Sequence, residues 1–145
     1  MKTQPFTIER TYNASISRVW KAITDKDEMK KWYFDIASFK PEIGFEFSFV
    51  APGKDEREQF LHLCKIVEVI PGKKLSYTWQ YEKVKGISTV TFELFAEDAN
   101  TTRLKLTHEG LESFVNGGSD FARESFAEGW TYIIGTSLND YVSGK

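Results

Sequence analysis

The side chains best suited to chemistry in this 145-residue chain are two histidines and one cysteine. His62 and Cys64 lie on one side of a strand-like segment, and His108 is far from both along the chain. Imidazole nitrogen and thiolate sulfur are good zinc ligands, but a zinc site needs several of them brought together. Two isolated histidines and one cysteine are more typical of structural positions, so we expect no metal site.

The motifs of the common catalytic and cofactor sites are missing. The chain has no glycine-rich phosphate loop, no dinucleotide-binding fingerprint, no nucleophile elbow and no His-Glu-x-x-His helix. Catalysis would also require polar side chains that can meet in one pocket. We therefore predict no catalytic residues and no cofactor, and binding is favoured over catalysis.

His108 has more than one interpretation. It alternates with Leu104 and Leu106, so it belongs to the apolar face of a strand. The simpler interpretation is a hydrogen-bonded core histidine at the edge of a sheet. The alternative is a polar group at a cavity mouth, which orients a ligand or accepts a proton near neutral pH.

Three rings with polar tips follow one another on one strand face, because Tyr77, Trp79 and Tyr81 alternate with polar residues. Core packing is the simplest explanation. A buried Tyr hydroxyl or Trp ring N–H needs a hydrogen-bond partner, however, and three in succession are hard to satisfy in a dry core. A cavity would relieve this, and its apolar walls would come from phenylalanines of other segments: Phe34, Phe39, Phe45, Phe47, Phe49 and Phe92.

Alternating patterns predict the strands that would position these rings. Seven strand candidates, joined by short polar turns, read as an antiparallel meander with one apolar face. Arg57 and Glu58, in a charged loop, could gate a site, but a solvated hairpin tip is the better interpretation. The predicted strands are residues 6–12, 34–39, 45–49, 59–70, 76–81, 89–94 and 103–108.

Helical patterns flank this meander. Ser15 and the pair Thr24-Asp25 are placed to cap two short helices after the first strand. After Gly117-Gly118, Ser119 or Asp120 can cap a long helix that reaches about Val142. At 100° per residue, its apolar stripe contains the following residues: Phe126, Ala127, Trp130, Ile133, Ile134, Ser137, Leu138 and Tyr141.

Two glycines inside the long helix, Gly129 and Gly135, each cost roughly 1 kcal/mol relative to Ala. They are either tolerated weaknesses or functional positions. In the second case they let the helix approach the sheet closely, or they leave a gap beside Trp130 and Ile134. The sequence leaves these alternatives open.

Composition bounds the remaining possibilities. Four Trp, six Tyr and twelve Phe supply a substantial core, and we expect one domain over residues 1–145. A net charge of −2 without a basic stripe argues against nucleic-acid binding. The chain has neither a signal-peptide pattern nor an 18-residue apolar run, so we expect no membrane association. Its single cysteine, Cys64, is compatible with the cytoplasm.

Several short runs together resemble a known family. They are Val19–Asp25 (VWKAITD), Gly44–Phe47 (GFEF), Val67–Leu75 (VEVIPGKKL), Tyr77–Trp79 (YTW), Thr89–Leu94 (TVTFEL), Leu106–Gly110 (LTHEG) and Gly129-Trp130 with Leu138 and Tyr141. In this order they resemble the START-like (SRPBCC, Bet v-like) superfamily, and within it the AHSA-type domains named after the activator of the 90 kDa heat-shock protein ATPase. Ile16 and Arg18 depart from the family's usual Pro and Glu, and His62 or Leu63 stands where a Gly is common.

The resemblance implies an α+β helix-grip fold, in which a curved antiparallel sheet of about six to seven strands wraps a long C-terminal helix. It also implies three possible functions. The leading hypothesis is binding of a small hydrophobic molecule between the sheet and that helix, and the alternatives are a cochaperone-like interaction module and a polyketide cyclase-like enzyme with His108, Tyr77 or Tyr81 as acid–base groups. The protein would be a monomer or a homodimer. The predicted ligand contacts are Trp32, Phe34, Phe39, Phe47, Tyr77, Trp79, Tyr81, Phe92, His108, Phe126, Trp130 and Ile134.

Overall fold

A six-stranded antiparallel sheet forms the framework of the protein. The computed structural model describes residues 5–52, 59–114 and 123–143. The strand order is β1-β6-β5-β4-β3-β2, so consecutive strands from β2 to β6 are neighbours and β1 joins beside β6. The strands are β1 (Phe6–Tyr12), β2 (Glu46–Pro52), β3 (Gln59–Ile70), β4 (Lys74–Tyr81), β5 (Ser88–Asp98) and β6 (Thr101–Glu109).

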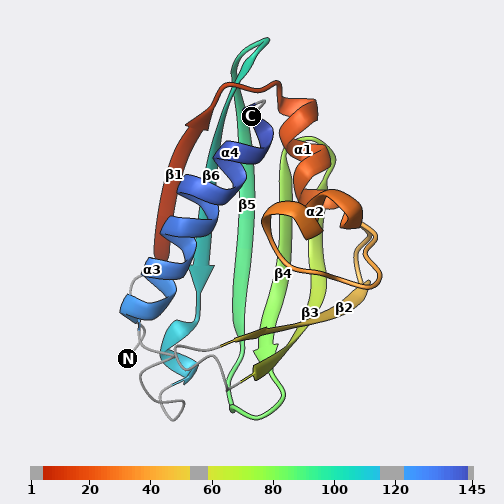
Figure 1. Cartoon of the computed structure of the whole chain (residues 1–145). Helices are drawn as coiled ribbons and strands as arrows, with labels where there is room; N and C mark the ends of the chain where they lie inside the picture. Colours follow the sequence, from red (N-terminus) through yellow and green to blue (C-terminus); the bar gives the residue numbers. More distant parts are fainter. Residues whose placement is uncertain (1–4, 53–58, 115–122, 144–145) are drawn as a thin grey trace.

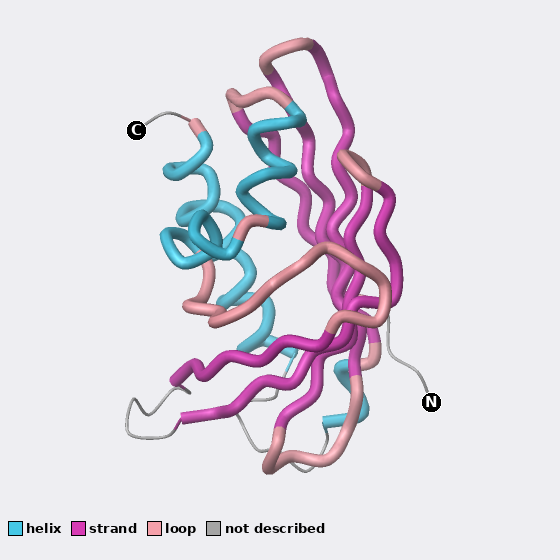
Figure 2. Tube along the Cα trace, turned by 90° about the vertical axis from the view of Figure 1, so that its right-hand side faces the viewer, coloured by secondary structure: helices cyan, strands magenta, loops and turns pink. Residues whose placement is uncertain are grey.

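The helices lie on one face of this sheet (Figures 1 and 2). Two short helices, α1 (Ile16–Thr24) and α2 (Lys26–Trp32), follow β1, and a short 3-10 turn, η1 (Leu111–Phe114), follows β6. The C-terminal helix consists of α3 (Arg123–Tyr132), a π-helical turn η3 (Ile133–Ser137) and α4 (Leu138–Val142). The predicted α+β helix-grip arrangement is therefore confirmed.

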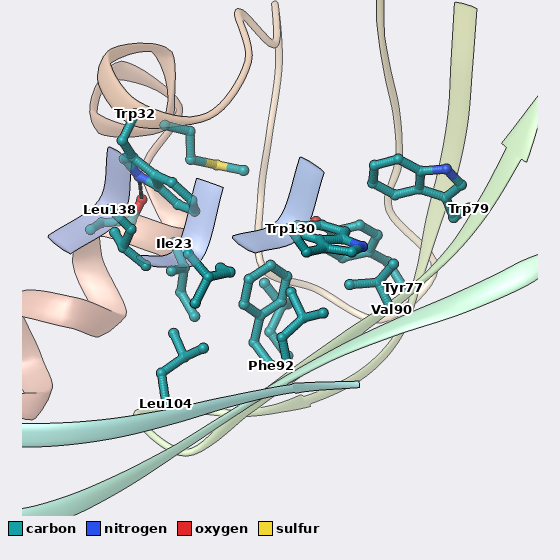
Figure 3. Packing of buried hydrophobic residues seen from close by; sticks show 14 of the residues in the cluster. Ile23, Trp32, Tyr77, Trp79, Val90, Phe92, Leu104, Trp130 and Leu138 are labelled. Atoms are coloured by element: carbon teal, nitrogen blue, oxygen red, sulfur yellow. Dashed lines mark hydrogen bonds between the residues drawn. The ribbon is translucent and has the colours of Figure 1, made fainter. Parts of the chain in front are cut away.

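One continuous hydrophobic core lies between the sheet and the helices. The apolar positions of neighbouring strands face one another in register: Val90 is opposite both Tyr77 and His108, and Phe92 is opposite Leu106. Figure 3 shows how Trp32 and Trp130 extend from the helices toward this face. A break in register between Ile66 and Glu68 marks an irregularity in β3, of the kind that bends a strand.

Both predicted helix caps are confirmed. The Ser15 hydroxyl accepts from the Arg18 N–H at 3.2 Å, and the Asp25 carboxylate accepts from the Asp27 N–H at 2.9 Å.

The Arg18 side chain of α1 connects three helices. Its guanidinium donates to Glu28 of α2 at 2.9 Å and to the Tyr141 carbonyl of α4 at 3.2 Å.

The predicted strand over residues 34–39 is wrong, because this segment is irregular and has no place in the sheet. Its apolar residues are nevertheless used. Ile36 and Phe39 are buried, and the Phe34 ring stacks on Phe49 at a centroid distance of 4.3 Å. The apolar pattern that predicted a strand therefore belongs to a loop whose apolar side chains pack into the core.

The C-terminal helix buries every fourth residue: Phe126, Trp130, Ile134, Leu138 and Val142. An ideal helical period places Ile133, Ser137 and Tyr141 in the apolar stripe beside Ile134 and Leu138, but these three residues are only half-buried, whereas Val142, outside that stripe, is buried. The π turn explains the difference, because its wider turn rotates the following residues relative to a regular α-helix. The Tyr12 hydroxyl donates to the Ile134 carbonyl in this turn at 2.7 Å. The predicted caps Ser119 and Asp120 and the loop residues Arg57 and Glu58 lie outside the described residues.

Candidate ligand-binding cleft

A cleft of about 680 Å³ opens between the C-terminal helix and one half of the sheet. Its walls come from the end of α2 and the residues after it, from β2, β3 and β4, and from α3 and η3. Most of the lining side chains carry aromatic rings. The described lining residues are Lys30, Lys31, Trp32, Tyr33, Phe34, Ala51, Phe60, His62, Trp79, Tyr81, Ser125, Phe126, Glu128, Gly129, Trp130, Tyr132, Ile133 and Ser137.

Half of the predicted ligand contacts line this cleft: Trp32, Phe34, Trp79, Tyr81, Phe126 and Trp130. The others are buried in the packed interior, away from the cleft: Phe39, Phe47, Tyr77, Phe92, His108 and Ile134. On β4, Trp79 and Tyr81 line the cleft, whereas Tyr77, nearer the start of the strand, is in the interior. Phe47 of β2 packs edge-on against Phe39 and Tyr77.

The lining residues that sequence reasoning missed come from α2 and the residue after it, from β2 and β3, and from the C-terminal helix. Tyr33 follows α2, Phe60 and His62 come from β3, and Lys30 and Lys31 lie on the last turn of α2. The ring run Trp32-Tyr33-Phe34 was the available signal for Tyr33. The predicted strand over residues 34–39 divided this run between two elements, so Tyr33 was not grouped with its two neighbouring rings.

Side-chain hydrogen bonds fix the end of α2 at the cleft. The Trp32 indole N–H donates to the Ala22 carbonyl at 2.8 Å, which satisfies a carbonyl in the last turn of α1. The Ser137 hydroxyl in turn donates to the Trp32 carbonyl at 2.7 Å. The π turn, α2 and α1 are thereby connected at the wall of the cleft.

A buried chain of hydrogen bonds positions Trp130 on the opposite wall. Its indole N–H donates to His108 Nδ1 at 3.0 Å, so Nδ1 carries no proton. His108 Nε2 therefore carries the proton and donates to the Ser88 hydroxyl at 2.8 Å, and that hydroxyl donates to the Trp79 carbonyl at 3.0 Å. Burial lowers the pKa of His108 to about 3, so the ring is neutral. The geometry is that of a core histidine, the simpler of the two interpretations.

The polar rings of β4 find partners within the protein. The Tyr77 and Tyr33 hydroxyls are 2.7 Å apart, and the Trp79 indole N–H donates to the Tyr81 hydroxyl oxygen at 2.7 Å. Burial is the main cause that raises the pKa values of Tyr33 and Tyr77 well above the ordinary tyrosine value. The expectation that a dry core cannot satisfy these groups is therefore wrong, because neighbouring rings pair with one another.

His62 forms part of the cleft wall as a neutral ring. It stacks on Phe49 with a centroid distance of 4.5 Å, and its Nδ1 lies 2.9 Å from the Phe60 carbonyl, so Nδ1 carries the proton. Burial lowers the pKa of His62 to about 4. Within the described residues, no group of three or more His, Cys, Asp and Glu is placed to hold a metal ion. Cys64 is buried, and burial raises the pKa of its thiol.

The two helix glycines have different surroundings. A Cβ on Gly129 would meet no atom within 4 Å, and Gly129 borders the cleft. A Cβ on Gly135 would lie 3.3 Å from Arg10 Nε, a side-chain atom of β1. Gly129 therefore leaves open space beside Trp130, and Gly135 allows a close approach to the Arg10 side chain.

Comparisons with known proteins agree with this architecture. A family model described as "Activator of Hsp90 ATPase homolog 1-like protein" matches residues 13–143. No curated protein matches the sequence. None of the described helices is both long and apolar enough to cross a membrane.

Solved structures with the same fold have little sequence identity to this chain. Protein CV1439 from Chromobacterium violaceum has a TM-score of 0.81 at 17% identity, with 99% of this chain and 100% of that chain covered. Protein BH1534 from Bacillus halodurans gives 0.76 at 24%, with 97% and 98% covered. CalU16 from Micromonospora echinospora gives 0.70 at 22%, with 97% and 74% covered.

Proposed function

The chain belongs to the family described as Activator of Hsp90 ATPase homolog 1-like protein, and we propose that it binds a small hydrophobic molecule in the cleft beside Trp130. The family match agrees with the resemblance read from the sequence motifs. We further propose a single-domain protein that acts in the cytoplasm, since its only cysteine is a free thiol.

The observation that carries the proposal is a ring-lined cleft of suitable size. Its volume of about 680 Å³ falls within the roughly 300–1,000 Å³ of typical small-molecule pockets. The large rings of its walls are held by packing and hydrogen bonds, and Trp32, Trp79 and Trp130 expose only 4%, 5% and 3% of their surface. A site with walls fixed before binding loses little conformational entropy when the ligand arrives.

The alternatives have less support. For a cyclase-like enzyme, His108 and Tyr77 would have to reach a substrate, but both are bonded within the interior and neither lines the cleft. Tyr81 does line the cleft, and its hydroxyl oxygen accepts from the Trp79 indole N–H. A cochaperone-like role rests on the family's description alone.

Binding can be tested with N-phenyl-1-naphthylamine, a neutral fluorescent probe. At about 100 times its Kd, a ligand specific for the folded state stabilises it by about 2.7 kcal/mol. For a chain of this size, we expect a rise in melting temperature of roughly 5–10 °C. Probe fluorescence should rise in parallel and saturate.

A matched pair of variants locates the binding. Gly129 borders the cleft, whereas Thr131 is exposed on the same helix and does not line the cleft. Gly129→Phe should fill part of the cleft and weaken probe binding by at least about tenfold, a loss of about 1.4 kcal/mol. Thr131→Phe should leave binding unchanged. Equal binding by both variants, or no binding by the unmodified protein, would contradict the proposal.

A further inference from the structure

Four of the cleft rings, those of Trp32, Tyr33, Trp79 and Trp130, have their polar atoms directed to other protein groups. The three indole N–H groups of Trp32, Trp79 and Trp130 donate to Ala22, Tyr81 and His108, respectively. The Tyr33 hydroxyl is bonded to that of Tyr77. These side chains therefore present ring carbon to the cleft, and their polar atoms are already engaged within the protein.

This arrangement favours flat aromatic ligands over polar ones. A sugar or another polyol would lose its hydrogen bonds to water against such walls without replacing them, which is costly. Flat aromatic molecules are different, because ring–ring contacts in stacked or edge-to-face geometry stabilise beyond simple area burial. The walls already contain both geometries: Tyr33 stacks on Trp32 at 4.9 Å, and Phe60 meets Tyr81 edge-on at 6.2 Å.

The charged residues of the lining are Lys30, Lys31 and Glu128. Lys30 and Lys31 are exposed on the last turn of α2. Among the described residues, neither lysine forms an ion pair. Glu128 is exposed on α3, the other helical wall. The cleft thus combines an interior of ring carbon with two unpaired cations and one carboxylate at its exposed edge.

We infer that the ligand is a flat aromatic molecule that carries a negatively charged group, with its rings among the cleft rings and its charge beside Lys30 and Lys31. This inference rests on the proposed function and narrows it to one chemical class. The rings supply most of the affinity. The lysines add a Coulombic attraction that is modest because they are exposed.

Two probes with nearly the same ring skeleton separate these contributions. 8-Anilinonaphthalene-1-sulfonate carries a sulfonate, and N-phenyl-1-naphthylamine does not. Replacing both lysines, Lys30→Gln with Lys31→Gln, should weaken sulfonate binding about three- to tenfold. Binding of the neutral probe should change by less than about twofold. Rising salt should weaken only the sulfonate.

Control variants assign the effect to the cleft. Lys26→Gln with Lys40→Gln removes the same charge from exposed positions outside the lining, and it should leave both affinities unchanged. Glu128→Gln should strengthen sulfonate binding by up to about threefold, because it removes a like charge. Dodecanoate, an anion with a flexible chain, should compete at least about tenfold less well than the sulfonate.

The outcomes distinguish this inference from the proposed function. If neither naphthalene probe binds, both are wrong. If the neutral probe binds at the cleft but the lysine pair has no effect on the sulfonate, the inference is wrong and the proposed function stands. Dodecanoate binding as tight as that of the sulfonate would likewise overturn the aromatic class.

Discussion

At the scale of single residues, His108 shows how a histidine on an apolar strand face becomes structural. Its two ring nitrogens are used in opposite senses, as acceptor from Trp130 and as donor to Ser88. A protonated ring would carry a second donor facing the Trp130 N–H, so only the neutral form fits. His108 thereby orients a wall of the cleft without lining it.

The two buried histidines should make stability depend on pH. The pKa values of His62 and His108 are lowered from 6.5 to about 4 and about 3. Below pH 6.5 the histidines of the unfolded chain bind protons that those of the folded state do not. The free energy of unfolding is therefore highest above this pH and decreases as the pH is lowered below it. Between pH 7.5 and 5 we expect a loss of about 2 kcal/mol per histidine, measured by urea unfolding.

His108→Asn isolates one of the two contributions. Because it removes one titrating ring, the loss of stability between pH 7.5 and 5 should be about half that of the unmodified protein. A variant with the full pH dependence would show that His108 is not held neutral. At pH 7.5 the variant should itself be less stable by about 1–3 kcal/mol, since it disturbs the bond to Ser88.

Sequence reasoning placed these rings on the correct strand face but could not supply their partners. The alternation of Tyr77, Trp79 and Tyr81 with polar residues predicted their burial, which is confirmed. The partner of Tyr77, however, is Tyr33, 44 residues earlier in the chain and outside regular structure. Such a pairing depends on how a loop crosses the sheet, and a strand period contains no information about it.

At the scale of elements, the π turn decides which face the C-terminal helix buries. Leu138 stays in the core and Val142 joins it, while Ser137 and Tyr141 are only half-buried. A sequence read at a constant 100° per residue cannot anticipate this shift. The turn also sets Ile133 and Ser137 in the cleft wall, and π turns are frequent at functional sites.

The two helix glycines provide a test at this scale. Gly129→Ala adds a methyl group in open space and improves helix propensity, so it should stabilise the protein by about 0.5–1 kcal/mol. Gly135→Ala places its Cβ 3.3 Å from Arg10 Nε, so that side chain must shift and the gain should be smaller or absent. Urea unfolding of both variants at neutral pH measures the difference. Equal gains would show that the approach of Arg10 to the helix is not restrictive.

At the scale of the whole molecule, the meander order of the strands and the placement of the helices follow from patterns in the sequence. Short polar turns make consecutive strands neighbours, and the amphipathic C-terminal helix needs an apolar face to cover. The position of the cleft does not follow in this way. It depends on how the C-terminal helix, the segment after α2 and the strands β2 to β4 come together, with Trp32, Trp79 and Trp130 among the lining residues.

The most direct test of ligand binding in the cleft uses the four tryptophans as internal reporters. Trp32, Trp79 and Trp130 line the cleft, whereas Trp20 on α1 does not. Proton–nitrogen NMR spectra resolve their indole N–H groups separately, and single Trp→Phe variants assign them. On titration with N-phenyl-1-naphthylamine, the signals of Trp32, Trp79 and Trp130 should shift and saturate together while that of Trp20 stays in place. A titration that moves Trp20 as much as the others, or moves none of the three, would contradict binding in this cleft.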